Sequence, residues 1–182
     1  MPYRGDPRNL FLARAGLFVA LAATLQAVES LIPSPAPWLR LGLGNALVLA
    51  ALILWGFRGG FLVATGKVLL GSLIAGRLIS HLFLFSLSGT YSSLFMMALA
   101  MALLPRMGYV GLSTLGAVAH SLAGLAVASV ILMGPAVWSL AVAVLPAAVL
   151  SGAVTGVAAW YLVKLSGGRV KALPVEGEDI RG

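Results

Sequence analysis

The sequence predicts an all-α membrane protein that folds as a bundle of six transmembrane helices. Of its 182 residues, 60% are hydrophobic and 9% are charged, and the mean hydropathy is +1.04. Soluble domains carry about 25% charged residues. Proline, glycine and polar residues also divide the chain into apolar segments, most of them close to the ~20 residues that a helix needs to cross a bilayer. This composition leaves little room for a separate soluble domain.

The segment boundaries follow the residues that interrupt helices. The first segment ends at a proline-rich turn, residues 33–37, and a polar tract at residues 86–93 precedes or opens the fourth. The second segment is short, so a bundle of five helices with a re-entrant second segment is the alternative. Pro146 lies inside the sixth segment, where a proline kinks or breaks a helix. The predicted segments are 10–32, 41–57, 59–80, a fourth that ends at 104, 110–133 and 137–165.

Lysine and arginine predict the orientation, because cytoplasmic loops carry an excess of both. Six helices place both termini on one side, which then collects nine of the 12 basic residues, whereas the opposite side has only Arg40. We therefore expect a protein of the cell membrane with both termini in the cytoplasm. Its parts are an N-terminal tail (1–9), a transmembrane domain (10–165) and a polar C-terminal tail (166–182). The nine residues are Arg4, Arg8, Arg14, Arg58, Arg106, Lys164, Arg169, Lys171 and Arg181.

Ionisable residues inside the apolar segments predict a polar cavity. Lys67 and Arg77 lie in the third segment, and Glu29, the only acid outside the terminal tails, lies in the first. Charged side chains are costly in hydrocarbon, so they normally face the interior of a bundle or a water-filled cavity. Glu29 and Arg77 fall at similar depth near the outer side and are expected to pair. Lys67 lies about 15 Å deeper, at 1.5 Å per helical residue.

These residues and their polar neighbours form the candidate substrate site. Arg77 is the strongest candidate, because a guanidinium stays charged and binds oxyanions with two hydrogen bonds. Structural roles are the alternatives: an ion pair for Glu29 with Arg77, snorkelling for Lys67 and a bond between helices for His120. The candidate substrate-binding residues are Gln26, Glu29, Arg40, Asn45, Lys67, Arg77, His81, Tyr91 and His120.

Small residues at four-residue spacing predict close contacts between helices. Gly16, Ala20 and Thr24 form one such stripe on the first segment, and Gly152 and Gly156 form another on the sixth. The first stripe is a candidate docking surface for a partner protein. Packing inside the bundle is the alternative for both stripes.

Several kinds of chemistry are not expected. The chain has no cysteine and two histidines, so we expect no metal site, and we expect neither a cofactor nor catalysis. Its basic residues are scattered at segment ends, which does not favour nucleic-acid binding. Residues 65–67 are similar to the end of an ATP-binding loop, but Val68 replaces the hydroxyl residue that holds magnesium. An ATP-driven step would need another subunit.

Four stretches of the chain are distinctive in combination: LGLGNALVL (41–49), KVLLGSL (67–73), SLSGTYSS (86–93) and GAVAH (116–120). Together they resemble the heptaprenyl diphosphate synthase component I family, also called the Gx transporter family. That family is similar to the substrate-binding S components of energy-coupling factor (ECF) transporters. The resemblance covers roughly residues 10–165. In the family, asparagine often follows the histidine of the fifth helix, where this chain has Ser121.

The resemblance implies a six-helix bundle with a substrate pocket open to the outside. It also implies a transmembrane coupling protein and two ATPases as partners. Prenyl diphosphate synthases are similar to one another in aspartate-rich motifs that hold magnesium and diphosphate, whereas this chain has only Asp6 and Asp179, both in its tails.

The leading hypothesis is therefore the substrate-binding membrane subunit of a small-molecule importer, which takes a polar or anionic substrate from the outer face. The alternatives are a membrane subunit of a quinone- or flavin-linked electron-transfer module and a membrane component of prenyl diphosphate metabolism.

Overall fold

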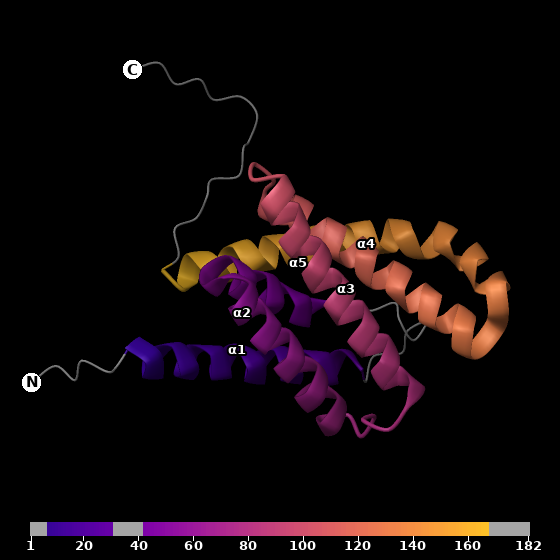
Figure 1. Cartoon of the computed structure of the whole chain (residues 1–182), viewed down its shortest axis with the longest axis horizontal. Coiled ribbons are helices and arrows are strands. Elements are labelled where there is room, and N and C mark those ends of the chain that lie inside the picture. Colours follow the sequence, from indigo (N-terminus) through magenta and orange to yellow (C-terminus); the bar gives the residue numbers. More distant parts are fainter. Residues whose placement is uncertain (1–6, 31–41, 168–182) are drawn as a thin grey trace, which may run out of the picture.

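The computed structural model describes residues 7–30 and 42–167, which form a bundle of helices (Figure 1). Five helices in these ranges are long and apolar enough to cross a membrane, and the same ranges contain no β-strand. The prediction of an all-helical membrane protein is confirmed, but its count of six helices is not matched. The elements are α1 (Pro7–Glu29), α2 (Leu43–Ile74), α3 (His81–Leu103), α4 (Tyr109–Ala128), the π-helical η1 (Ser129–Met133), the 3₁₀-helical η2 (Gly134–Leu140) and α5 (Ala141–Leu165).

The helix count differs because the predicted second and third segments form one element, α2. Gly56 is the single non-helical residue inside it, with φ 71° and ψ −168°, and it divides α2 into two arms that meet at a bend (Figure 1). This backbone region is open almost only to glycine. Helical geometry resumes at the next residue, so no loop separates the arms. The first arm, residues 43–55, is roughly 20 Å long, which is short for a membrane span.

Other boundaries also differ from the prediction. Helix α2 ends at Ile74, so Arg77 lies in the turn before α3 and not within a helix. The polar tract at residues 86–93 lies inside α3, whose N-cap is Ser80. Helix α5 continues through Pro146 without interruption. At the end of α2 the apolar run continues past the point where the backbone leaves the helix, whereas in α3 and α5 the helix continues through residues that were expected to interrupt it.

The bundle is organised around α2. Helix α1 packs mainly against α2, α4 packs against α3 and α5, and α2 connects these groups through its contacts with α3 and α5. Every residue from 46 to 52 on the first arm of α2 is at most 3% exposed. A helix that is apolar on all sides can lie in a core or face lipid, and the burial of these residues decides for the core. Residues 46–52 of the first arm of α2 therefore lie in the centre of the bundle, surrounded by protein.

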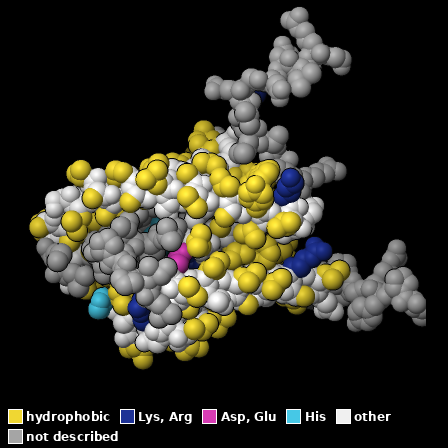
Figure 2. Space-filling model, turned by 180° about the vertical axis from the view of Figure 1, so that it is seen from behind, with side chains coloured by type: hydrophobic (Ala, Val, Ile, Leu, Met, Phe, Trp, Pro, Cys, Tyr) yellow, Lys and Arg dark blue, Asp and Glu magenta, His cyan; other side chains and the backbone are white. Residues whose placement is uncertain are grey.

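The surface of the bundle is suited to lipid. Large apolar side chains are exposed on all five helices, among them Leu17, Leu73, Leu99, Leu122 and Leu150. Figure 2 shows one face covered mainly by hydrophobic side chains, with most of the visible lysine and arginine at the end where α1 begins and α5 ends. An apolar exterior on a bundle of long apolar helices is that of a multi-pass membrane protein.

The start of α1 and the end of α5 lie at the same end of the bundle (Figure 1). This arrangement suits two termini on one side of a bilayer. Their location in the cytoplasm stays a prediction, and most of both predicted tails lies outside the described residues.

We predict that Gly56→Ala destabilises the protein by about 1–3 kcal/mol, because a Cβ is unfavourable in this backbone region. An added Cβ would have no described atom within 4 Å, so the effect would come from the backbone alone. The measurement is thermal unfolding of the purified protein in detergent micelles. Gly16→Ala is the matched control, since Gly16 is helical and equally uncrowded. Equal midpoints for both variants would contradict the prediction.

Candidate functional site

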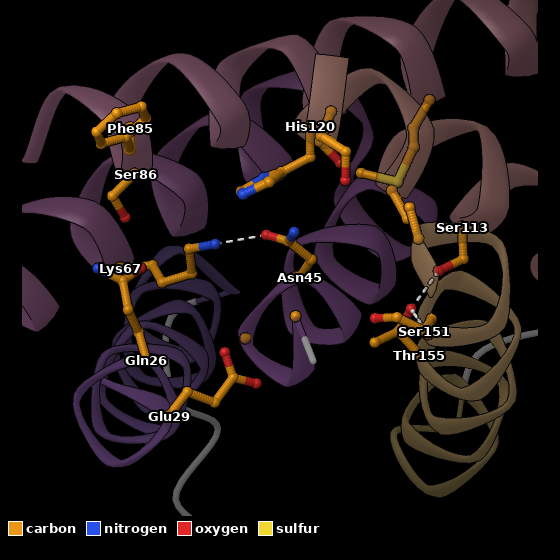
Figure 3. Close-up of a pocket in the computed structure, with 17 residues that line it drawn as sticks. Gln26, Glu29, Asn45, Lys67, Phe85, Ser86, Ser113, His120, Ser151 and Thr155 are labelled. Atoms are coloured by element: carbon orange, nitrogen blue, oxygen red, sulfur yellow. Dashed lines mark hydrogen bonds between the residues drawn. The ribbon is translucent and has the colours of Figure 1, made fainter. Parts of the chain in front are cut away.

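A polar cavity lies in the middle of the bundle (Figure 3). All five helices contribute to its lining, and its volume is about 50 Å³, counted as space for the centres of water molecules. A single water needs about 10–15 Å³ on this measure, so the cavity has room for about three to five. The lining residues are Gln26, Glu29, Gly42, Gly44, Asn45, Lys67, Phe85, Ser86, Ser93, Met97, Ser113, Ala117, His120, Ser121, Ala148, Ser151 and Thr155.

Lys67 brings a positive charge into this cavity from the second arm of α2. Its side chain is 4% exposed, and its Nζ donates a hydrogen bond of 2.5 Å to Asn45 Oδ1 on the first arm. The aliphatic stem lies over Gly44, where an added Cβ would be 3.1 Å from Lys67 Cδ. The bend at Gly56 brings the two arms of α2 together, so one helix supplies both the ammonium and its acceptor.

Glu29 lines the same cavity and also joins two helices. It is the last residue of α1, and its Oε1 accepts a hydrogen bond of 2.6 Å from the backbone N of Leu43, the first residue of α2. A carboxylate at a helix N-terminus satisfies an N–H group that has no partner within the helix, and it interacts favourably with the helix dipole. Gly42, the N-cap of α2, makes no side-chain cap bond. Glu29, which belongs to α1, therefore caps the N-terminus of α2.

Helices α4 and α5 line the cavity with hydroxyl groups that the sequence analysis did not select. The Oγ of Ser113 and the Oγ1 of Thr155 are 2.6 Å apart, and both side chains are buried. Ser121 and Ser151 also line the cavity. Ser113 and Ser121 are eight residues apart, and Ser151 and Thr155 are four apart, so each pair lies on one helix face. This spacing is the signal that could have identified them.

His120 reaches the cavity from α4 because α3 has a glycine beside it. A Cβ added at Gly89 would lie 2.6 Å from Cε1 and Nε2 of His120 and 2.7 Å from Nδ1. The imidazole therefore occupies the space that any other residue at position 89 would fill. Gly89 lies in the polar tract but contributes no polar side chain to the cavity. Its lack of a side chain leaves room for the His120 ring.

Five of the nine predicted site residues line this cavity, and Arg77 is not among them. The Nη2 of Arg77 donates a hydrogen bond of 2.9 Å to the backbone O of Ser30, just after α1. A cation at the C-terminus of a helix interacts favourably with the helix dipole. Arg77 lines a smaller neighbouring cavity, which shares Gln26 and Ser86 with the main one. The predicted pairing of Arg77 with Glu29 stays a prediction.

The other three predicted residues are not part of the main cavity as described. His81 is exposed at the start of α3, where its ring meets Phe85 edge-on at 6.4 Å. The hydroxyl of Tyr91 lies 2.9 Å from Thr65 Oγ1, and its ring lines a separate apolar groove. Arg40 lies outside the described residues.

The two stripes of small residues have different surroundings. Gly16, Ala20 and Thr24 are all exposed on α1. Gly152 and Gly156 are buried, and a Cβ at either would lie 2.6 Å from a Cα of α4. The second stripe is therefore a close contact within the bundle, and the first is open to other molecules.

The model of the family described as heptaprenyl diphosphate synthase component I matches residues 18–162. The chain belongs to this family. The match confirms the resemblance seen in the sequence, and it covers every residue that lines the cavity. No match was found among the curated proteins or the solved structures.

We predict that Gly89→Ala costs about 1–3 kcal/mol of stability, because the new methyl group overlaps the His120 ring. The measurement is thermal unfolding of the two single variants and the double variant with His120→Ala. The cost of Gly89→Ala should largely disappear in the His120→Ala background, since the alanine leaves room for the methyl group. An unchanged cost there would show that the clash lies elsewhere.

Proposed function

We propose that this protein is the substrate-binding membrane subunit of a small-molecule importer, similar to the S components of ECF transporters. The observation that carries the proposal is Lys67, a 4% exposed cation that lines a polar cavity inside an apolar bundle. Ionisable residues at such positions mark substrate and ion pathways. The bundle is apolar outside, and its helices bring a set of polar groups together in one central cavity, as a small-molecule site requires.

The cavity is suited to binding. Amides, hydroxyls, one ammonium and one carboxylate come from five different helices, so a ligand would meet donors and acceptors on several sides. The groups are fixed by bonds to one another, as in the pairs Lys67–Asn45 and Ser113–Thr155. Fixed polar groups lower the cost of ordering a site around its ligand. We propose that the protein holds its substrate without converting it.

The importer would need partners. We propose that a transmembrane coupling protein docks against the exposed stripe of Gly16, Ala20 and Thr24, and that two ATPases supply the energy. Small exposed residues let a second helix approach closely within a bilayer. The substrate would enter from the outer face of the cell membrane, with both termini of this subunit in the cytoplasm.

We predict that Lys67→Met lowers substrate binding at least tenfold, which is about 1.4 kcal/mol. Methionine follows the path of the lysine stem but removes the charge, and loss of one member of a buried polar pair weakens binding strongly. The measurement is mass spectrometry of small molecules that co-purify with the full-length protein, per mole of protein. Lys164→Met is the matched control, because Lys164 is exposed at the end of α5.

A normal amount of co-purified molecule in the Lys67→Met protein would contradict the proposed site. Co-purification that is lost equally in Lys164→Met would point to a general effect of charge. Thermal unfolding of both variants separates loss of binding from loss of the fold.

We also predict that Gly16→Leu combined with Ala20→Leu abolishes co-purification with the coupling protein and the ATPases. The larger side chains would hold a partner helix away from α1, because close approach needs small residues. The experiment co-expresses the three kinds of subunit and isolates them through a tag on this one. Val154→Leu is the control, since it enlarges a 58% exposed residue on α5. A complex that survives the double substitution would exclude this face as the docking site.

A further inference from the structure

A second cavity, smaller than the central one, lies beside Arg77. Its volume is about 10 Å³ on the same measure, which is room for about one water molecule. Residues of α1, α2, α3 and the turn before α3 line it. Gln26 and Ser86 line both cavities, and Figure 3 shows them on the side of the central cavity away from Ser113.

The smaller cavity has a positive charge. Arg77 is the one charged side chain among the described residues that line it. The central cavity next to it contributes one charge of each sign, from Lys67 and Glu29, so the two cavities together have an excess of one positive charge. The start of α3 adds partial positive charge, because Leu82 in its first turn lines the smaller cavity and its N-cap residue, Ser80, makes no side-chain cap bond.

The ends of α1 and α2 also lie at this cavity, and the C-terminus of a helix carries partial negative charge. Several of the last carbonyl oxygens of both helices already accept hydrogen bonds. On α2, the backbone N–H groups of residues 75–77 donate to the carbonyl oxygens of residues 71–73. On α1, Ser30 donates to the carbonyl oxygen of Ala27 through both its N–H and its hydroxyl, and Arg77 donates to the carbonyl oxygen of Ser30. Much of the negative charge of these helix ends is therefore compensated.

Hydrogen-bond donors at this cavity are left over. Ser72 is 4% exposed and Gln26 is 6% exposed, and within the described residues neither side chain has a hydrogen-bond partner. Buried polar groups normally have one. The guanidinium of Arg77 has five N–H groups, of which the bond to the carbonyl oxygen of Ser30 uses one. The cavity thus offers N–H and O–H donors around a fixed positive charge.

We propose that the smaller cavity binds one monovalent anion of halide size, of which chloride is the most abundant in biology. Arg77, Ser72 and Gln26 would donate hydrogen bonds to it, and such charge-assisted bonds are stronger than neutral ones. Room for one water admits an ion of a single atom but not a tetrahedral oxyanion. The ion would connect α1, α2 and the turn before α3, so its binding would stabilise the fold. This inference goes beyond the importer function and does not depend on it.

The test uses the full-length protein in dodecyl maltoside micelles, which carry neither charge nor phosphate. Chloride replaces gluconate at constant ionic strength, so that screening of charges stays the same, and thermal unfolding is followed. The midpoint should rise with chloride and then level off. Bromide should act in the same way, and sulfate should have no effect. The line width of the chloride NMR signal measures binding directly, and bromide should narrow it by displacement.

Three variants check that this cavity is responsible. Arg77→Gln should abolish the midpoint shift and the extra NMR line width, because it removes the charge. Arg58→Gln is the matched control, since Arg58 is exposed elsewhere on α2. Ser72→Ala keeps every charge and should raise the half-saturating chloride concentration about tenfold, the usual loss for a hydrogen bond to an ion. It tests the site even if Arg77→Gln does not fold.

A lipid phosphate group is the rival anion, so the measurement is repeated in phosphatidylcholine nanodiscs. A chloride shift that is retained there supports a free ion. A shift that is present in micelles and absent in nanodiscs would assign the donors to a lipid headgroup and overturn the chloride site. The absence of any shift in micelles, or an equal shift in Arg77→Gln, would also overturn it. None of these results bears on the substrate of the central cavity, which Lys67→Met tests separately.

Discussion

The structure depends on the burial of one ammonium group inside an apolar bundle. Lys67 is acceptable at this position because Gly44 leaves space for its stem and Asn45 accepts a hydrogen bond from its Nζ. Both of these residues are on the first arm of α2, and Lys67 is on the second, so the bend at Gly56 is what brings donor and acceptor together. A buried cation demands polar surroundings, and residues from all five helices meet that demand.

The sequence predicted the charged and amide residues of the cavity but not its hydroxyls. Lys67 and Glu29 were recognisable because an ionisable residue in an apolar segment needs a reason to be there. Ser113 and Thr155 were not, because a hydroxyl in a helix can bond to its own backbone and so carries little information alone. Arg77 was assigned to a helix because the apolar run continues beyond Ile74, whereas the positive φ of Gly76 marks where the backbone leaves the helix.

The helix count was not matched because the structure joins two predicted segments. The sequence placed a division at residue 58, between segments 41–57 and 59–80, and the bend at Gly56 lies two residues away. The prediction took this division for a loop between separate helices, whereas helical geometry resumes directly after Gly56, so both arms belong to one element. The close approach of α4 and α5 was predictable, because Gly152 and Gly156 lie four residues apart. The same spacing on α1 fits both packing and docking, and only the exposure of Gly16, Ala20 and Thr24 separates them.

The enclosure of residues 46–52 on the first arm of α2 has a consequence for biogenesis. These residues belong to a cluster that includes Leu94 of α3 and both Ala159 and Val163 of α5. These neighbours are synthesised after the arm itself. Residues 46–52 can therefore become fully enclosed only after α5 has been synthesised. The cavity that holds the Lys67 ammonium is likewise complete only when α5, the last helix, has joined the bundle.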